Sequence, residues 1–256
     1  MLNLAIFTAL GWERRAVVAA LDAVEPAGPA AWRGLLPGDG GTCLVVQTGV
    51  GQKRAGAVAH RVPDARAFLA AGCAGGLVDW LRPGDLVVAS SIVPVEADGQ
   101  SGGALPADPS CVPLAAACGF RVHTGAVLSS PVLGSALGTL DAAAGEALVV
   151  EMESAAIAAE AANRGVPFVG VRVVLDVRGQ TIPALDALDE ATGEIRARRA
   201  VATLLGRPWL WPAVVRLARQ TRTADRALRA VMPAVIPAFL GRVPAPRAVP
   251  AQAMTY

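Results

Sequence analysis

Histidine and cysteine are scarce in this chain of 256 residues, which contains two histidines and four cysteines. The cysteines form no C-x-x-C pair, and neither His60 nor His123 stands at the spacing of a zinc ligand. The two histidines also lack a neighbouring serine or cysteine pattern, so surface or core roles fit them better than catalysis. We therefore expect no bound metal and a reducing, cytoplasmic location.

A strong charge of one sign and a long apolar run are also missing. The 23 basic and 21 acidic residues leave a net charge of +2, which does not indicate nucleic acid as the main partner. The mean hydropathy of +0.47 is high, but it comes from alanine and valine rather than from a run long enough to span a membrane. We expect a soluble protein with a small or lipid-like ligand, and no export signal at the apolar N-terminus.

Short apolar segments alternate with glycine turns and helical patterns along the first two thirds of the chain. Such repeated units predict one α/β domain with a central mixed, largely parallel sheet flanked by helices. The run Gly72–Gly76 is interpreted as a turn. Strands are expected at Leu2–Thr8, Thr42–Thr48, Phe68–Ala71, Leu86–Ser90, Val122–Ser129, Ala147–Glu151 and Pro167–Asp176, and helices at Glu13–Leu21, Gln52–Arg61 and Glu153–Arg164.

Composition divides the chain into three parts. Residues 1–206 form the expected catalytic domain, in which Glu96–Pro113 is interpreted as a loop that closes over a site. Residues 207–242 form an arginine-rich helical appendage, and 243–256 a disordered Pro/Ala tail. The appendage is expected to consist of helical segments broken at Pro208, Pro212, Pro233 and Pro237.

Carboxylates follow several expected strands, where ligands gather in open α/β sheets: Glu13, Glu151, Glu153 and Asp176. Asp176 closes the buried strand Val-Arg-Val-Val-Leu, so burial should raise its pKa and keep a proton for donation, although a capping role fits its position equally well. Glu151 and Glu153 share one face if their segment is extended. Glu153 otherwise belongs to the first turn of a helix, where the helix dipole stabilises it.

Six motifs occur in an order that resembles the nucleoside phosphorylase superfamily, and above all the methylthioadenosine/S-adenosylhomocysteine nucleosidases. The resemblance covers most of Leu4–Asp176. The motifs are Ala9-Leu10-Gly11-Trp12-Glu13, Thr48-Gly49-Val50-Gly51, Gly72-Cys73-Ala74-Gly75-Gly76-Leu77, Gly84-Asp85-Leu86-Val87-Val88, Val150-Glu151-Met152-Glu153-Ser154 and Val171-Arg172-Val173-Val174-Leu175-Asp176.

This resemblance implies an enzyme that cleaves the N-glycosidic bond of a purine nucleoside. It implies that Asp176 protonates adenine N7, that Glu153 holds the ribose hydroxyls and that Met152 packs on the sugar, while Glu13 and Arg172 orient the nucleophile. Prepositioned carboxylates would stabilise the oxocarbenium-like sugar. The remaining substrate-binding positions are Glu151, Cys73 and Gly75 in the glycine run, and Val132 in a purine-pocket wall at Pro131–Leu133.

The finer resemblance concerns the substrate. Trp12-Glu13-Arg14-Arg15 and the arginine-rich tail are similar to the hopanoid-associated phosphorylases, which implies adenosylhopane as substrate, with methylthioadenosine or S-adenosylhomocysteine as the alternative. Leu175 replaces the serine that usually precedes the aspartate, and no acidic residue occurs in Val177-Arg178-Gly179. Relatives imply a homodimer.

The sequence does not decide whether water or phosphate is the nucleophile. No resident cofactor is expected. The arginine that precedes the glycine run in many phosphorylases has no counterpart in Phe68–Ala71, leaving Arg14, Arg15 and Lys53 as replacements. The trio Glu13, Glu153 and Arg172 instead resembles the hydrolytic members.

Three other interpretations are considered. A dinucleotide site at Gly49-Val50-Gly51 is rejected because Arg54 occupies the third glycine position. A non-catalytic nucleoside-binding protein remains an alternative. The tryptophans and arginines of residues 207–229 form either an amphipathic element that contacts a membrane surface or, the interpretation with the larger prior, a helix with a solvated arginine face.

Overall fold

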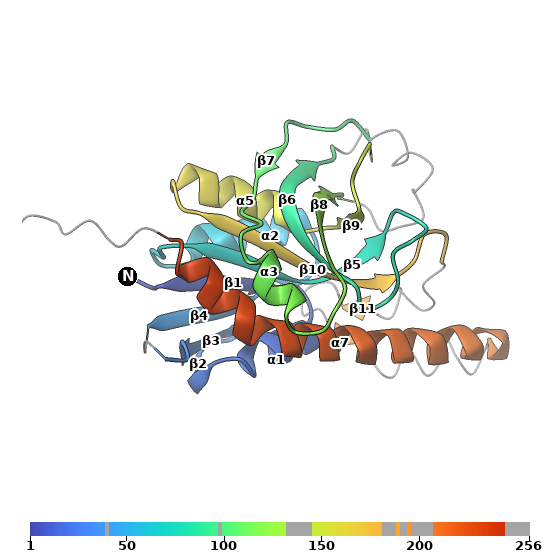
Figure 1. Ribbon diagram of the computed structural model, residues 1–256, viewed down its shortest axis with the longest axis horizontal. Coiled ribbons are helices and arrows are strands. Elements are labelled where there is room, and N and C mark those ends of the chain that lie inside the picture. The colour runs from blue at the N-terminus through green and yellow to red at the C-terminus, as the bar shows by residue number, and fades with distance from the viewer. Residues whose placement is uncertain are drawn as a thin grey trace, which may run out of the picture.

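The computed structural model describes residues 1–38, 41–96, 99–131, 145–180, 188–189, 194–195 and 207–243. Its elements follow one another as strands and helices of a single α/β domain (Figure 1). They are β1 (Leu4–Thr8), α1 (Gly11–Val18), β2 (Asp22–Gly28), β3 (Ala31–Leu35), β4 (Thr42–Gln47), α2 (Gln52–Arg61), β5 (Phe68–Gly76), β6 (Leu86–Pro94), β7 (Leu105–Pro106), α3 (Val112–Ala116), β8 (Val122–Ser129), β9 (Val149–Glu151), α5 (Ser154–Asn163), β10 (Phe168–Asp176), β11 (Leu188–Asp189), β12 (Glu194–Ile195), a short 3-10 turn (Pro208–Leu210) and α7 (Trp211–Leu240).

Ten of these strands form one mixed sheet, which confirms the expected fold class. Parallel pairing runs through β4, β1, β5 and β10, and the order continues from β10 through β6 and β8 to β9. Because β9 pairs with β5, which also pairs with β10, the five strands β5, β10, β6, β8 and β9 close into a ring. The ring brings the ends of β5, β9 and β10 to one place.

Helices cover both faces of the sheet (Figure 1). Strand alternation explains this, because Leu4 and Ile6 of β1 point into the core that includes α1, α3 and α7, whereas Ala5 and Phe7 point into the core that includes α2 and α5. Most of these strands are buried on both faces, as β1 is along its whole length. Two hydrophobic layers thus fix the sheet between the helices.

The glycine run is strand rather than turn, which corrects the sequence interpretation. β5 continues through Gly76 and pairs with β10 as far as Gly75. The glycines serve close approach, since a β-carbon on Gly72 would lie 2.8 Å from both Arg172 Nη1 and Glu13 Oε1. A glycine pattern alone does not distinguish a turn from a strand against which other side chains pack.

The hairpin of β2 and β3, which extends the sheet beyond β4, was not predicted from the sequence. All seven residues of β2 are exposed, so its sequence, Asp-Ala-Val-Glu-Pro-Ala-Gly, carries no buried-strand pattern. The segment Glu96–Pro113, expected to be a loop, contains β7 and the start of α3, while residues 97–98 lie outside the described part. Backbone pairing with neighbouring strands places the hairpin and β7 in the sheet.

A helix follows the catalytic region, as expected, but the prolines do not divide it. α7 runs unbroken through Pro233 and Pro237, because its C-terminal half is held by burial of Leu228, Val231 and Phe239 in the core. The proposed boundary at residue 206 lies outside the described residues, as do residues 244–256 of the tail expected from residue 243. Val243 itself is buried in the core beside the end of α7, which corrects the first residue of that tail. Among the helices described, none is both long and apolar enough to cross a membrane.

Candidate active site

Glu13 is the first buried carboxylate at the carboxyl end of the sheet. It occupies the first turn of α1, directly after β1, and its Oε2 accepts hydrogen bonds from the N–H groups of Ala9 and Leu10, both at 2.9 Å. Its Oε1 accepts the N–H of Cys73 at 2.8 Å. Burial raises the pKa of Glu13 despite these hydrogen bonds. The carboxyl is thus fixed against β5 with an increased affinity for a proton.

Arg172 and Glu151 form a buried ion pair beside it. Arg172 Nη2 donates to Glu151 Oε2 and to Ser154 Oγ, both at 2.6 Å. Glu151 also accepts the N–H groups of Glu153 and Ser154 at 2.9 to 3.0 Å. Burial opposes the charge of Arg172, but the carboxylates of Glu151, Glu153 and Glu13 outweigh it and raise the pKa of the guanidinium. Glu151 is therefore committed to holding Arg172 and the start of α5.

Glu153 lies at the N-cap of α5 and faces α2. Its Oε1 accepts the N–H of Gly51 at 2.8 Å, and burial, followed by repulsion from Glu151, raises its pKa. An extended segment would have placed Glu151 and Glu153 on one strand face. The strand ends at Glu151, so the two carboxylates do not share such a face. The chain turns between them, and each carboxylate reaches its own partners.

Asp176 ends β10 at an irregularity in the sheet. Val174 is opposite Ala74, but Asp176 is opposite Gly75, so the register shifts by one residue at Leu175. The bulge places the Asp176 carboxylate beside Gly75, where Oδ2 lies 3.3 Å from the position of a glycine β-carbon. Burial raises the pKa of Asp176 to about 6, as its position in the sequence suggested. Asp176 therefore has the property that a proton donor requires near neutral pH.

Cys73 lies between these groups. Its N–H binds Glu13, and the carboxylates of Glu13 and Asp176 add to burial in raising the pKa of its thiol well above the ordinary value, against the opposing charge of Arg172. The thiol is therefore protonated at neutral pH. This agrees with a contact role and gives no support to a nucleophilic one.

Met152 borders a surface hollow of about 970 Å³ next to these carboxylates. Val50, Gly51, Pro131 and Ala156 also line it, together with the first turn of α2. Lys53 is exposed at this hollow, whereas Arg14 lies 3.9 Å above the Trp32 ring. Val132, expected in a purine-pocket wall, lies outside the described residues.

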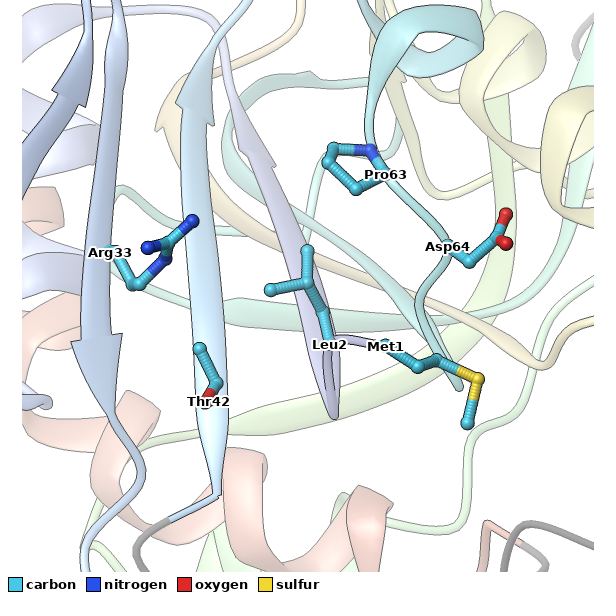
Figure 2. Close-up of a pocket in the computed structure, with 6 residues that line it drawn as sticks. All are labelled: Met1, Leu2, Arg33, Thr42, Pro63 and Asp64. Atoms are coloured by element: carbon cyan, nitrogen blue, oxygen red, sulfur yellow. The ribbon is translucent and has the colours of Figure 1, made fainter.

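A second hollow, of about 540 Å³, lies at the opposite end of β1 (Figure 2). Figure 2 shows Arg33 and Asp64 on opposite sides of Leu2, with Met1, Thr42 and Pro63 completing the lining. The lining contains none of the predicted site residues, because Leu2 precedes β1 whereas Glu13 follows it. The chemistry therefore belongs to the other end of the sheet.

The sequence analysis assigned no role to two buried serines of the site. Ser154 Oγ accepts a hydrogen bond from the Arg172 guanidinium, and Ser129 Oγ accepts one from the N–H of Ala155 at 3.1 Å. Gln52 Nε2 donates to the Ser129 carbonyl at 3.0 Å and so links α2 to β8. Ser154 belongs to a recognised motif, but the contacts of Ser129 and Gln52 arise only when distant strands meet.

The fold and the site define a class of enzyme. Buried carboxylates and one buried arginine surround the carboxyl ends of β1, β5, β9 and β10, and Asp176 supplies an acid with a pKa of about 6. Such a site suits acid-assisted cleavage of a bond to a sugar. The chain belongs to the Phosphorylase superfamily, whose model matches residues 3–206. It is an enzyme of the nucleoside phosphorylase and nucleosidase class, which cleaves N-glycosidic bonds.

Solved structures share this fold. The 5'-methylthioadenosine/S-adenosylhomocysteine nucleosidase of Neisseria meningitidis, in complex with methylthio-immucillin-A, has a TM-score of 0.67 and 19% identity, covering 92% of this chain and 99% of that one. The Colwellia psychrerythraea nucleosidase, in complex with adenine, has a TM-score of 0.64 and 20% identity, covering 94% and 96%. Futalosine hydrolase of Helicobacter pylori has a TM-score of 0.63 and 18% identity, covering 90% and 97%.

Proposed function

We propose that this enzyme releases adenine from a 5′-substituted adenosine, with Asp176 as the proton donor. The observation that carries the proposal is the placement of Asp176 on the bulge of β10, beside Gly75 and with a pKa of about 6. A base that departs from C1′ takes both electrons of the N-glycosidic bond. Protonation at N7 lets it depart neutral, and one positioned acid contributes about 10² to 10⁴ in rate.

The sugar is assigned to the space between Glu153 and Met152. Glu153 is fixed by the N–H of Gly51 at Oε1 and by the N–H of Met152, 3.3 Å away, at Oε2. A carboxylate oxygen can accept more than one hydrogen bond, so the fixed group can also accept a ribose hydroxyl, and Met152 borders the hollow beside it. Developing positive charge on the ribose is favoured by nearby carboxylates in a site of low dielectric constant. Two nucleosidases of similar fold, one in complex with methylthio-immucillin-A and the other with adenine, support a ligand of this kind.

We propose water rather than phosphate as the nucleophile. Three buried carboxylates, Glu13, Glu151 and Glu153, surround one guanidinium, and Arg172 is already held by Glu151 and Ser154. This excess of acidic groups disfavours a phosphate dianion. Water adds to C1′ as the bond to the base breaks, Asp176 gives its proton to the base, and Glu13 accepts the proton lost by the water. The raised pKa of Glu13 suits that role.

For the 5′ substituent, adenosylhopane is the proposed substrate and methylthioadenosine or S-adenosylhomocysteine the alternative. The hollow beside Met152 could hold a bulky apolar 5′ group, because Val50, Pro131 and Ala156 are among the residues that line it and it opens to the surface. The nucleosidase neighbours support the smaller substrates. The resemblance to those enzymes also leads us to propose a homodimer, which sedimentation of the protein would test.

The deciding experiment measures adenine release from adenosylhopane and from methylthioadenosine, each with and without phosphate. We expect release without phosphate that is faster from adenosylhopane, and a loss of about 10² to 10⁴ in Asp176→Asn with nucleoside binding retained. Phosphate-dependent release would overturn the assignment of water. Unchanged turnover in Asp176→Asn would remove Asp176 from the mechanism, and binding without release by the native enzyme would favour a nucleoside-binding protein.

A further inference from the structure

The segment that precedes the buried half of α7 is exposed and strongly basic. We call residues 207–223 the outer segment; it comprises the 3-10 turn and the first half of α7. It contains four arginines and no acidic residue, although the whole chain has a net charge of only +2. No side chain described in this segment is fully buried. The arginines are Arg207, Arg216, Arg219 and Arg222, all exposed.

Large apolar side chains share this exposure. Trp209 is 70% exposed, Trp211 56% and Val215 50%, and they lie close together at the start of α7. Residues four apart lie on one helix face, so Trp211, Val215 and Arg219 form a stripe that continues to Arg222. Tryptophan next to arginine is the combination that suits the boundary between lipid headgroups and water.

The outer segment lies at the active-site end of the sheet. Gln220 and Gln180 exchange two hydrogen bonds of 2.8 and 2.9 Å, and Gln180 follows Asp176 by four residues. In Figure 1 this half of α7 extends past the sheet on the side toward which β5 and β10 point. A surface contacted by the outer segment would therefore face the same end of the sheet as Asp176.

We propose that the outer segment docks the enzyme on an anionic lipid surface. The arginines meet the lipid phosphates, while Trp209, Trp211 and Val215 enter the headgroup region. The four arginines of the outer segment, with no acidic residue beside them, favour an anionic partner. The exposed tryptophans favour a lipid layer over a dissolved polyanion. The inference stands without the proposed reaction, since it concerns residues after position 206, where the match to the superfamily ends.

The test uses the full chain, without substrate, and vesicles of phosphatidylcholine alone or with about a third phosphatidylglycerol. We expect sedimentation with the anionic vesicles only, decreasing with added salt. The double variant Arg219→Gln/Arg222→Gln should bind about thirtyfold more weakly, because each basic residue near an anionic leaflet contributes about a factor of five. Trp209→Ala/Trp211→Ala should also weaken binding.

The matched control is Arg33→Gln/Arg61→Gln, which removes two exposed arginines outside the outer segment and should bind like the native protein. Equal losses in the control and the outer-segment variant would overturn the proposal, as would equal binding to neutral vesicles or no vesicle binding at all. Binding of the native protein to DNA but not to vesicles would replace the lipid by a dissolved polyanion. Adenine release from methylthioadenosine, measured in parallel, should be unchanged in every variant, so failure of the reaction and failure of docking are separable.

Discussion

Burial gives individual carboxyl groups of the active site different chemical roles. Asp176 is partly buried without an ion pair among the described contacts, so its pKa rises to about 6. Glu151 instead pairs with Arg172 and accepts hydrogen bonds from two backbone N–H groups, those of Glu153 and Ser154. One group can therefore hold a proton for donation while the other stabilises a cation. Their different environments, rather than residue type, separate the two roles.

The pH dependence of the reaction should reveal the proton on Asp176. Because the pKa is raised, the donor form persists up to about pH 6 and declines about tenfold per pH unit above it. We expect kcat/KM for methylthioadenosine to fall with rising pH above about 6. The residual activity of Asp176→Asn should lack this decline. A native profile that stays flat from about pH 6 to pH 8 would contradict the assignment.

Gly72 should be indispensable for a steric reason. A β-carbon there would lie 2.8 Å from Glu13 Oε1 and Arg172 Nη1, so Gly72→Ala must displace both side chains. We expect kcat to fall about a hundredfold, the effect of displacing positioned groups by about 1 Å. Gly103→Ala is the control, because nothing lies within 4 Å of its β-carbon position. Equal activity of the two variants would show that the site can accommodate the change.

At the scale of elements, α7 has two halves that differ in burial. The half that follows Thr223 buries Ala224, Leu228 and Phe239 against α1, α3 and β10, whereas the half before it is exposed. Packing thus accounts for an unbroken helix despite two internal prolines, because the buried face offsets the hydrogen bonds that proline cannot donate. The C-terminal half is part of the core.

Stability measurements should distinguish the two halves. Phe239 is fully buried, so Phe239→Ala should lower the free energy of unfolding by about 3 to 5 kcal/mol through lost burial and a cavity. Trp209→Ala removes a larger but exposed side chain and should change it by less than about 0.5 kcal/mol. Urea unfolding followed by circular dichroism gives both values. Similar losses in the two variants would show that the outer segment also packs on the domain.

At the scale of the whole molecule, closure of five strands into a ring separates a rigid part from an open edge. β5 and β10 are hydrogen-bonded on both sides within the ring, whereas β2, among the described strands, pairs only with β3 and is exposed along its length. Arg172 and Asp176, to which we assign catalytic roles, both lie on β10. A rigid strand suits groups whose positions decide the rate.

Hydrogen exchange should reveal this difference. Amides of β5 and β10 should exchange only on global unfolding, and those of β2 through local opening that leaves the ring intact. Exchange monitored by mass spectrometry in native buffer resolves the two groups. Exchange of β10 as fast as that of β2 would show that the ring does not act as one cooperative unit.

The sequence by itself determined most of the central strands and indicated several candidate site residues. The local sequence patterns predicted β8 and α2 with their observed bounds, Val122–Ser129 and Gln52–Arg61. Polar residues at strand ends identified Glu13, Glu151, Glu153 and Asp176 as candidates, and a family resemblance supplied their roles. The superfamily match covers residues 3–206, and the roles of individual residues stay predictions.

Only the tertiary structure decided how these residues meet. The glycine run is a strand because it pairs with β10 and β9, and position 72 needs glycine because Glu13 and Arg172, both distant in sequence, occupy the space beside it. The bulge at Leu175 places Asp176 beside Gly75, a register that depends on pairing between β5 and β10. Helix α7 continues through its prolines because the core buries its far half. Local composition specifies burial and propensity, whereas close approach and register arise from contacts between distant segments.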